Sequence, residues 1–406
     1  MLRVDHWHCL RRMMETGVCT VAAICVLAGC KSRPPAPPAD LEVGPPWGTL
    51  RREGLFADDQ RASFALERDM DGKPRWPILV LAGTGSRTAF AAGLLGGWSE
   101  TGERPRFQVV TGVGPAATLA TFAFLGSDYD EALSSLYVLE TRDVYRRLGL
   151  VTTLNEGALY SPKPLRQRLE ERISDEVLDA VASEHATGRR LYVGTTNLDT
   201  NKFVIWDMGA IASSERPERR ERYVDVLMAS ASPPPTYPPV YIEVDAEDES
   251  SFWHAHVDGG VKEPAFLRSF MMPPRELMQQ SGVDPEDVRV EIYVILGDQL
   301  SGRSAYAMPV RQNLNQLTQA NVMALRATAI NASLYRVNAQ VSRHGLRVRF
   351  AAIPDRVESL PQPGVFQPDK LQSLFDDGYA SGASGDTWTD LDNLLALYGL
   401  LEEAVP

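Results

Sequence analysis

Three glycine-bounded turns hold the side chains of this sequence that are best placed to do chemistry. The first is "LAGTGSRTAFAAGLL" at residues 81–95, which follows an apolar strand. The second is "FQVVTGVGPAATLATFAFLGS" at residues 107–127, which reads as a strand, a sharp turn at Gly114 and a helix. The third is "VDGG" at residues 257–260, where Asp258 ends a strand. These turns indicate an anion site, a turn of the kind that presents a nucleophile in serine hydrolases, and a carboxylate able to act as a base.

The first turn has the outline of an anion site. Gly83 and Gly85 allow backbone amides to converge, Ser86 and Arg87 come next, and the helix that follows points its positive end at the loop. The loop lacks the third glycine of a dinucleotide fingerprint and the Gly-Lys pair of a phosphate-binding P-loop. The alternative that it only packs a helix on a strand stays open.

The order and spacing of the three turns resemble those of the patatin-like phospholipase family. The stretches "LGGWSETGERPRFQVVTGV", "YVGTTNLDTNKFVIWDMGAIA" and "VLMASASPPPTYPPVYI" resemble that family as it occurs in bacterial lipoproteins, and the similarity covers roughly residues 76–264. The resemblance implies acyl-ester hydrolysis by a Ser-Asp dyad. The serine of a G-x-S-x-G elbow attacks, the aspartate of D-G-[GA], here Asp258, is its base, and a G-G-G-x-[RK]-G loop stabilises the oxyanion.

The elbow departs from the family pattern. "GVGPA" keeps Gly112, but Gly114 stands in the serine slot and Ala116 in the slot of the second glycine. Without a side-chain oxygen at position 114, no acyl-enzyme forms there. Glycine adopts the strained turn more easily than serine, and Pro115 suits the first position of the helix. We therefore expect the backbone shape to persist while the chemistry is lost.

The oxyanion loop departs from the pattern as well. Thr84 and Thr88 stand where the family has glycine, and we expect their Cβ atoms to impair oxyanion capture. In the alternative that the protein is an active lipid acyl hydrolase, Ser86 or Thr111 would serve as a substitute nucleophile with Asp258. The elbow geometry aims neither of them at the oxyanion site.

The strand before the third turn carries a metal-like pattern. In "HAHVD", His254, His256 and Asp258 alternate along a strand and so share one face. Two imidazoles and a carboxylate are suitable metal ligands. Because Asp258 already has the role of the dyad acid, we expect surface or hydrogen-bonded histidines, no metal and no cofactor.

The N-terminus has the features of a secretory signal. Three arginines precede an apolar run at residues 18–28, which is too short to span a bilayer. The ending Leu27-Ala28-Gly29-Cys30 resembles the lipobox of bacterial lipoproteins, which implies acylation of Cys30; an ordinary signal peptide that ends near a cysteine is the alternative. All four cysteines lie at or before Cys30, so no disulfide framework is expected after processing.

The charge of the chain limits its partners. The formal net charge is −12, and removal of residues 1–29, which carry three arginines against two acidic residues, would leave −13. Such a surface disfavours nucleic acid and offers no attraction to anionic lipid. We therefore expect membrane contact through the lipid anchor. The resemblance to the patatin-like family implies a lipid or acyl chain as ligand, and an interaction module at the membrane surface is the other possibility. Lys31 after the cysteine resembles lipoproteins sorted to the outer membrane, which predicts an exported protein on its periplasmic face.

The 406 residues divide into four predicted parts. These are a signal peptide at 1–29, a Pro-rich tether at 30–46, a patatin-like α/β domain at 47–300 and a C-terminal extension at 301–406 that packs on the same domain. Strand-like runs alternate with helical periodicity, which predicts an α/β three-layer sandwich with a mixed, mostly parallel sheet between helices and a helical C-terminal extension.

Further helices are predicted from the pattern outside the turns. They cover residues 164–186, about 264–280 and about 311–341. A strand, "LRVRFAAI", is predicted to follow the last of them.

Overall fold

The computed structural model describes residues 33–38, 41, 43–44, 46–50, 66–69, 71–83, 85–136, 144–244, 251–280, 282–299, 314–354, 357, 360, 366–385 and 387–390. The predicted signal peptide, the predicted acylation site Cys30, Thr84 of the first loop and the end of the chain after residue 390 lie outside the described residues.

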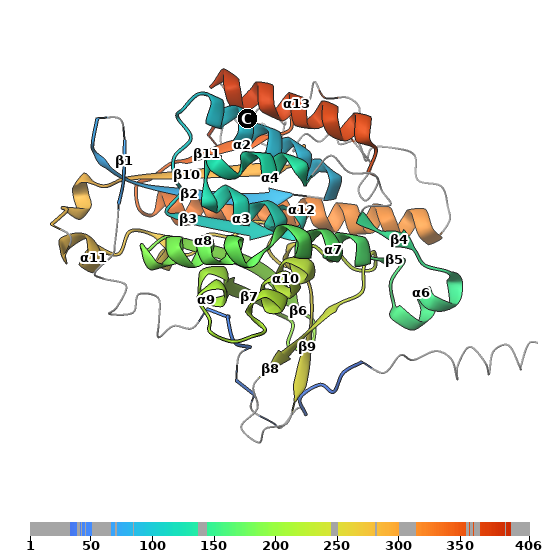
Figure 1. Cartoon of the computed structure of the whole chain (residues 1–406). Coiled ribbons are helices and arrows are strands. Elements are labelled where there is room, and N and C mark those ends of the chain that lie inside the picture. The colour runs from blue at the N-terminus through green and yellow to red at the C-terminus, as the bar shows by residue number, and fades with distance from the viewer. Residues whose placement is uncertain are drawn as a thin grey trace, which may run out of the picture.

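In the described part of the chain, a mixed sheet of nine strands runs through the domain (Figure 1). Its main path has the order β11-β10-β2-β3-β6-β9-β8, while β1 pairs with β2 and β7 with β6. The parallel strands are β11 (Val348–Ala352), β10 (Arg289–Gly297), β2 (Pro74–Gly83), β3 (Val109–Val113) and β6 (Arg190–Asn197). The antiparallel strands are β9 (Phe252–Asp258), β8 (Val240–Val244), β7 (Lys202–Asp207) and β1 (Glu67–Arg68). Two short strands, β4 (Arg146–Arg147) and β5 (Tyr160–Ser161), pair separately.

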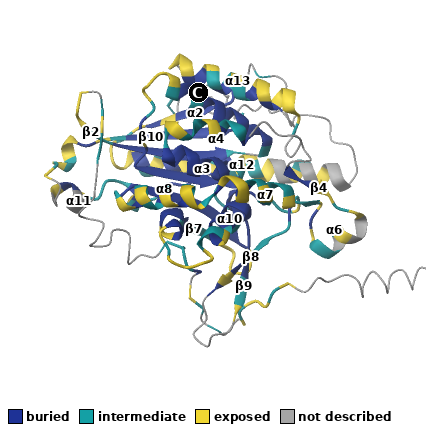
Figure 2. Ribbon diagram, in the orientation of Figure 1, coloured by how far each residue is buried: buried dark blue, intermediate teal, exposed yellow. Residues whose placement is uncertain are grey.

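Apolar residues cover both faces of the central strands. Along β2, Leu79 and Leu81 belong to one hydrophobic core and Ile78 and Val80 to the other, as the alternation of a strand requires. The buried residues, dark blue in Figure 2, accordingly run through the sheet and the helices next to it. The predicted α/β fold with a mostly parallel sheet between helices is confirmed.

The helices form the outer layers. They are α2 (Thr88–Glu100), α3 (Ala117–Leu125), α4 (Asp130–Ser135), α6 (Leu150–Glu156), α7 (Lys163–Arg172), α8 (Asp175–Ala186), α9 (Met208–Ala212), α10 (Arg219–Ser230), α11 (Arg275–Gln280), α12 (Leu314–Ser342) and α13 (Pro368–Ser384). None of the helices described is both long and apolar enough to cross a bilayer.

Two of the predicted helices differ from the structure. The helix predicted at 164–186 is split into α7 and α8, because Ser174 caps the start of α8 by accepting a hydrogen bond from the Val177 amide at 3.4 Å. The helix predicted near 264–280 is reduced to a 3₁₀ turn at Ser269–Met271 and the short α11. Pro273 and Pro274 lie between them, and proline cannot continue a helical hydrogen-bond ladder.

The C-terminal extension is part of the same body. β11 pairs in parallel with β10 at the sheet edge, and α13 packs on α2 through glycines of both helices. A Cβ atom added at Gly97 would lie 2.0 Å from the Tyr379 carbonyl oxygen, and one added at Gly382 would lie 2.2 Å from that of Leu94. The extension therefore contributes a strand as well as helices.

The start of the predicted tether lies on the domain. Residues 30–46 are expected to stand as a spacer, yet the Trp253 amide of β9 donates to the Pro35 carbonyl at 2.9 Å. The Arg33 guanidinium also forms an ion pair with Asp199 at 2.6 Å. Opposite charges and a free strand-edge amide hold this stretch, so its described part is not a free spacer.

β3 and β9 pair with the same edge of β6, and their C-terminal residues meet there. Val113, the last residue of β3, pairs with Gly194, and Asp258, the last residue of β9, pairs with the next residue, Thr195. β7 occupies the opposite edge of β6 over the same stretch, so β3 and β9 must share the remaining edge. This topology brings the second and third turns of the sequence together.

Candidate active site

The second turn forms a strand, a tight turn and a helix. Gly114 has a φ of +67°, a value in the left-handed region that favours glycine, and Pro115 occupies the first turn of the 3₁₀ segment Gly114–Ala116 that leads into α3. Gly112 allows the close packing of β3 on α3, because a Cβ atom there would lie 2.8 Å from the Ala117 Cα atom. The backbone is thus shaped as an elbow with no side chain at its tip.

The tip of this elbow faces Asp258. A Cβ atom built on Gly114 would lie 3.1 Å from Oδ1 of Asp258, 3.6 Å from Oδ2 and 3.1 Å from the Gly83 carbonyl oxygen. A side chain at position 114 would therefore point at the carboxylate assigned as the dyad base and at the end of the first loop. The structure brings the three sequence motifs to one point.

Asp258 is buried, with only 1% of its surface exposed. Its Oδ1 accepts a hydrogen bond of 2.7 Å from the Gly260 amide, and its own amide donates to the Ser232 carbonyl at 3.0 Å. Burial raises the pKa of Asp258, while the positive charge of Arg326 and the Gly260 amide oppose the rise. The carboxylate is fixed in place and has the raised pKa typical of a general base.

Arg326 of α12 also reaches this point. One terminal nitrogen of its guanidinium lies 3.6 Å from Oδ2 of Asp258, and another donates to the Gly83 carbonyl at 3.4 Å. Its Nε is buried, and no hydrogen-bond partner for it is present among the described residues. The guanidinium thus contacts both groups that a side chain at position 114 would face.

Ser230 at the end of α10 holds the elbow by a hydrogen bond to its backbone. The Gly114 amide donates to Ser230 Oγ at 3.1 Å, and this hydroxyl donates to the Gly194 carbonyl at 2.8 Å. Its only sequence signal is the small-residue stretch "MASASPPP" at residues 228–235. The hydroxyl is engaged in holding backbone and is 0% exposed.

The first loop forms a 3₁₀ turn, Gly85–Arg87, that leads into α2. The Arg87 side chain is buried in an ion pair with Asp298, just after β10, so this cation ties the loop to the sheet. The Thr88 hydroxyl donates to the Gly85 carbonyl at 2.6 Å, and its methyl group fills the space where a Cβ atom on Gly83 would stand.

The two proposed substitute nucleophiles lie in the structure as follows. The Thr111 hydroxyl donates to the Phe266 carbonyl at 3.2 Å, and Ser86 is 0% exposed. In the described part of the chain, no serine or threonine hydroxyl makes a hydrogen bond to the Asp258 carboxylate.

Of the two histidines before Asp258, His256 takes part in a hydrogen-bond chain, whereas Nδ1 of His254 is buried and has no hydrogen-bond partner among the described residues. The Trp206 indole donates to Thr195 Oγ1 at 2.8 Å, and Thr195 Oγ1 lies 2.9 Å from Nδ1 of His256. Burial lowers the pKa of His256 to about 3 and also lowers that of His254. Among the residues the structure describes, no three His, Cys, Asp or Glu side chains are grouped so that they could hold a metal ion.

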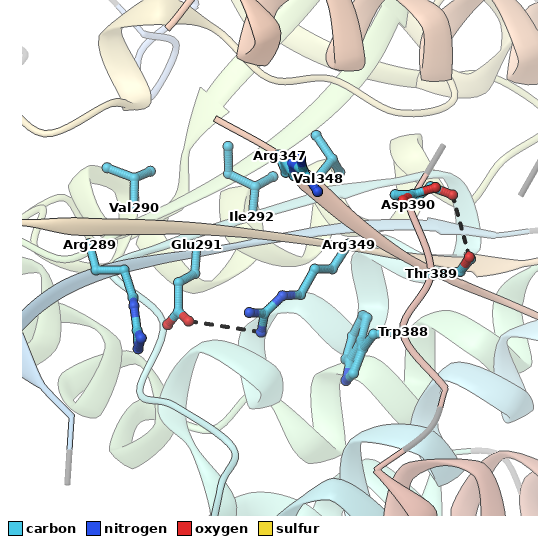
Figure 3. Close-up of a pocket in the computed structure, with 10 residues that line it drawn as sticks. All are labelled: Arg289, Val290, Glu291, Ile292, Arg347, Val348, Arg349, Trp388, Thr389 and Asp390. Atoms are coloured by element: carbon cyan, nitrogen blue, oxygen red, sulfur yellow. Dashed lines mark hydrogen bonds and ion pairs between the residues drawn. The ribbon is translucent and has the colours of Figure 1, made fainter. Parts of the chain in front are cut away.

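A separate cavity of about 400 Å³ opens at the amino ends of β10 and β11 (Figure 3). Arg349 lies beside Glu291 there, with 3.8 Å between the charged atoms, and donates to the Tyr293 hydroxyl at 3.0 Å. Gly297 at the other end of β10 pairs with Gly83, so the cavity lies at the end of the sheet away from Asp258.

Comparisons with known proteins find one family model and similar solved structures. Residues 79–271 match the family model described as patatin-like phospholipase. That segment includes Gly114 and Asp258 but not Arg326. The crystal structure of VipD from Legionella pneumophila is similar over 83% of this chain and 70% of that chain, with 10% sequence identity and a TM-score of 0.31. No curated protein gives a significant match.

Proposed function

We propose that this patatin-like domain does not hydrolyse acyl esters and acts at a membrane surface by binding a lipid or acyl chain or by interaction with another protein. The observation that carries the proposal is the geometry of position 114. Its missing side chain would point at Asp258 from 3.1 Å, so the base has kept its place while the nucleophile is absent.

The contacts of Arg326 support the same proposal. In a Ser-Asp dyad the carboxylate must receive a proton from the serine hydroxyl. Here a guanidinium lies 3.6 Å from that carboxylate and neutralises it. The positive charge of Arg326 opposes the rise in pKa that burial gives Asp258, so the carboxylate is a weaker proton acceptor than it would be in the same buried place without the cation.

The alternative function is an active lipid acyl hydrolase with a substitute nucleophile. It requires a hydroxyl within hydrogen-bond reach of Asp258. The Thr111 hydroxyl donates to the Phe266 carbonyl and Ser86 is fully buried, which disfavours both as nucleophiles. The observation that favours this alternative is the hydrogen bond from the Gly260 amide to Asp258, which holds the carboxylate where a base would be needed.

We further propose that the protein is exported and anchored by acylation of Cys30, at the periplasmic face of the outer membrane. The support is the lipobox-like sequence "LAGC" after an apolar run. Metabolic labelling with an alkyne palmitate should tag the full-length chain, and Cys30→Ala should lose both the label and the sedimentation with membranes. Retention of Cys30→Ala in the membrane pellet would count against the anchor.

Ligand binding is tested with parinaric acid, a naturally fluorescent fatty acid, and the purified chain that lacks residues 1–29. We expect saturable binding that palmitate displaces. Asp258→Asn keeps the shape of the side chain and should retain the binding, since the proposal needs no base. Absence of saturable binding in both proteins would reject the acyl-binding role and leave the interaction role.

A further inference from the structure

Arg33, at the start of the described chain, is clamped to the domain. Its two terminal nitrogens donate to Oδ1 and Oδ2 of Asp199 at 2.6 and 3.0 Å, the two-pronged geometry that makes arginine–carboxylate pairs strong. One of these nitrogens also donates to the Trp253 carbonyl at 3.1 Å. The guanidinium carbon lies 5.6 Å from the centre of the Tyr241 ring, within the range of a cation–π contact.

The contacts of Arg33 with Asp199 and Trp253, called the clamp below, are supported by backbone groups of β9. Asp199 Oδ2 accepts a hydrogen bond of 2.8 Å from the Ala255 amide of β9. Two residues after Arg33, the Pro35 carbonyl accepts one of 2.9 Å from the Trp253 amide. Both ends of the contact are therefore fixed to the first residues of β9, and the chain cannot swing freely at Arg33.

Cys30 precedes Arg33 by three residues. An extended chain spans at most about 3.3–3.6 Å per residue, so these two residues are separated by at most about 11 Å. A lipid attached to Cys30 would therefore hold Arg33, and the strands to which it is clamped, next to the bilayer surface.

We propose that the end of the domain formed by Arg33, the turn at residues 198–202 and the start of β9 faces the lipid bilayer, so that the domain is held in one orientation. This inference rests on the proposed acylation of Cys30. Leu198 beside Asp199 is 46% exposed, and Lys202 at the end of the turn is exposed, which suits an interface of lipid tails and phosphate groups. This end, called the clamp end, lies at the bottom of Figure 1, while α13 lies at the top.

The proposed orientation fixes the distance between the candidate site and the bilayer surface. Asp258 follows Trp253 by five residues along β9, and a strand rises about 3.3 Å per residue, so the site lies about 17 Å beyond the clamp end. A domain held by the clamp keeps the site at that distance from the bilayer. On a flexible tether, the domain would rotate freely and the distance would vary.

The test uses two single-cysteine proteins, Lys202→Cys at the clamp end and Lys370→Cys on α13. The processed chain would have no other cysteine than Cys30, whose thiol is acylated, so each new thiol takes a fluorophore alone. The labelled full-length proteins are reconstituted into phosphatidylethanolamine–phosphatidylglycerol vesicles that contain a lipid with a nitroxide headgroup. The domain is roughly 50 Å across, so a headgroup quencher separates the two positions clearly.

We expect strong quenching at position 202 and little at position 370. Arg33→Ala should bring the ratio of the two signals toward one while the protein stays on the vesicles. Lys31→Ala is the matched control, because it removes a cation near the anchor but leaves the clamp, and it should keep the original ratio.

Two other results overturn the inference and separate it from the proposed function. Equal quenching at both positions on bound protein, unchanged by Arg33→Ala, rejects the orientation and leaves the anchor standing. Failure of the full-length protein to bind vesicles, as expected for Cys30→Ala, rejects the acylation and with it the orientation.

Discussion

Gly114 and Asp258 face each other at the distance of a side-chain contact: a Cβ atom on Gly114 would lie 3.1 Å from Oδ1 of the carboxylate. The relationship follows from the sheet, because β3 and β9 end opposite Gly194 and Thr195, which are neighbours on β6. It does not depend on a side chain at position 114, so a glycine there leaves the arrangement intact.

Gly114→Ser tests whether only the nucleophile is missing. Serine at a φ of +67° should cost about 1–2 kcal/mol of stability, and its Cβ atom must gain a few tenths of an ångström from Asp258 and Gly83. We expect a folded protein that reacts slowly with a fluorophosphonate, measured by intact mass, and no reaction in Gly114→Ser/Asp258→Asn.

Gly102→Ser is the matched control for the backbone strain. Gly102 has a φ of +71°, and an added Cβ atom would meet nothing within 4 Å. It should lose a similar free energy of unfolding in urea and should not react with the probe. Equal reactivity of the two serine variants would mean that the position facing Asp258 has no special geometry.

Arg326→Gln tests the ion pair in the site. Removal of the guanidinium leaves a buried carboxylate that accepts a hydrogen bond from the Gly260 amide but has lost its cation, and we expect a loss of about 1–3 kcal/mol in the free energy of unfolding. The loss should shrink in the Asp258→Asn background, since the two residues are coupled. Urea unfolding of the four proteins of this double-mutant cycle gives the coupling energy.

Arg336→Gln on the same helix is the control for this cycle. Its ion pair with Glu263 is 3.5 Å long, and its side chain is 56% exposed, so we expect a change below about 1 kcal/mol. Strictly additive losses for Arg326→Gln and Asp258→Asn would show that the guanidinium does not stabilise the carboxylate.

His256 should make the fold sensitive to acid. Burial lowers its pKa to about 3, whereas an unfolded histidine has a pKa of about 6.5. Below about pH 6.5 the unfolded chain therefore binds a proton that the folded chain does not. Stability should fall by up to about 1.4 kcal/mol per pH unit from this group as the pH falls toward 3.

His256→Asn should make the pH dependence of the urea midpoint shallower between about pH 6.5 and pH 4. His254 and His185, whose pKa values burial also lowers, would account for the dependence that remains. An unchanged slope in His256→Asn would show that His256 titrates normally in the folded protein.

Gly97→Ala should separate α13 from α2. The added methyl would lie 2.0 Å from the Tyr379 carbonyl oxygen, and such overpacking costs about 1–3 kcal/mol. Gly96→Ala is the matched control, because its methyl would meet the Tyr379 ring at an ordinary 3.6 Å and alanine favours a helix by up to about 1 kcal/mol. Thermal unfolding should move in opposite directions, and equal shifts would contradict the close approach of the helices.

Sequence reasoning found the parts of the site that are local in the chain. A glycine between a strand and a helix predicts a tight turn, and Asp-Gly-Gly predicts a carboxylate at a strand end. It did not find Arg326, because an arginine within a long helix is usually solvated and nothing in the sequence shows that α12 passes Asp258. The contact between Gly83 and this guanidinium depends on residues 243 apart.

Arg33 shows the same limit at the other end of the chain. Proline-rich composition predicts an extended spacer, and the composition is indeed unsuited to a helix or a packed core. The contact with Asp199 joins residues 166 apart, and no local pattern records it. The division of the predicted helix at 164–186 into two could not be predicted for the same reason, because Ser174 is recognisable as a cap only once α8 is known to begin after it.

The most direct test is labelling of the unmodified protein. The chain without residues 1–29 is incubated with a fluorophosphonate, and turnover of p-nitrophenyl butyrate is followed in parallel, with Asp258→Asn as the comparison. We expect no covalent adduct and no turnover above that of Asp258→Asn. Stoichiometric labelling and turnover that Asp258→Asn abolishes would contradict the loss of the nucleophile and establish a hydrolase with a different one.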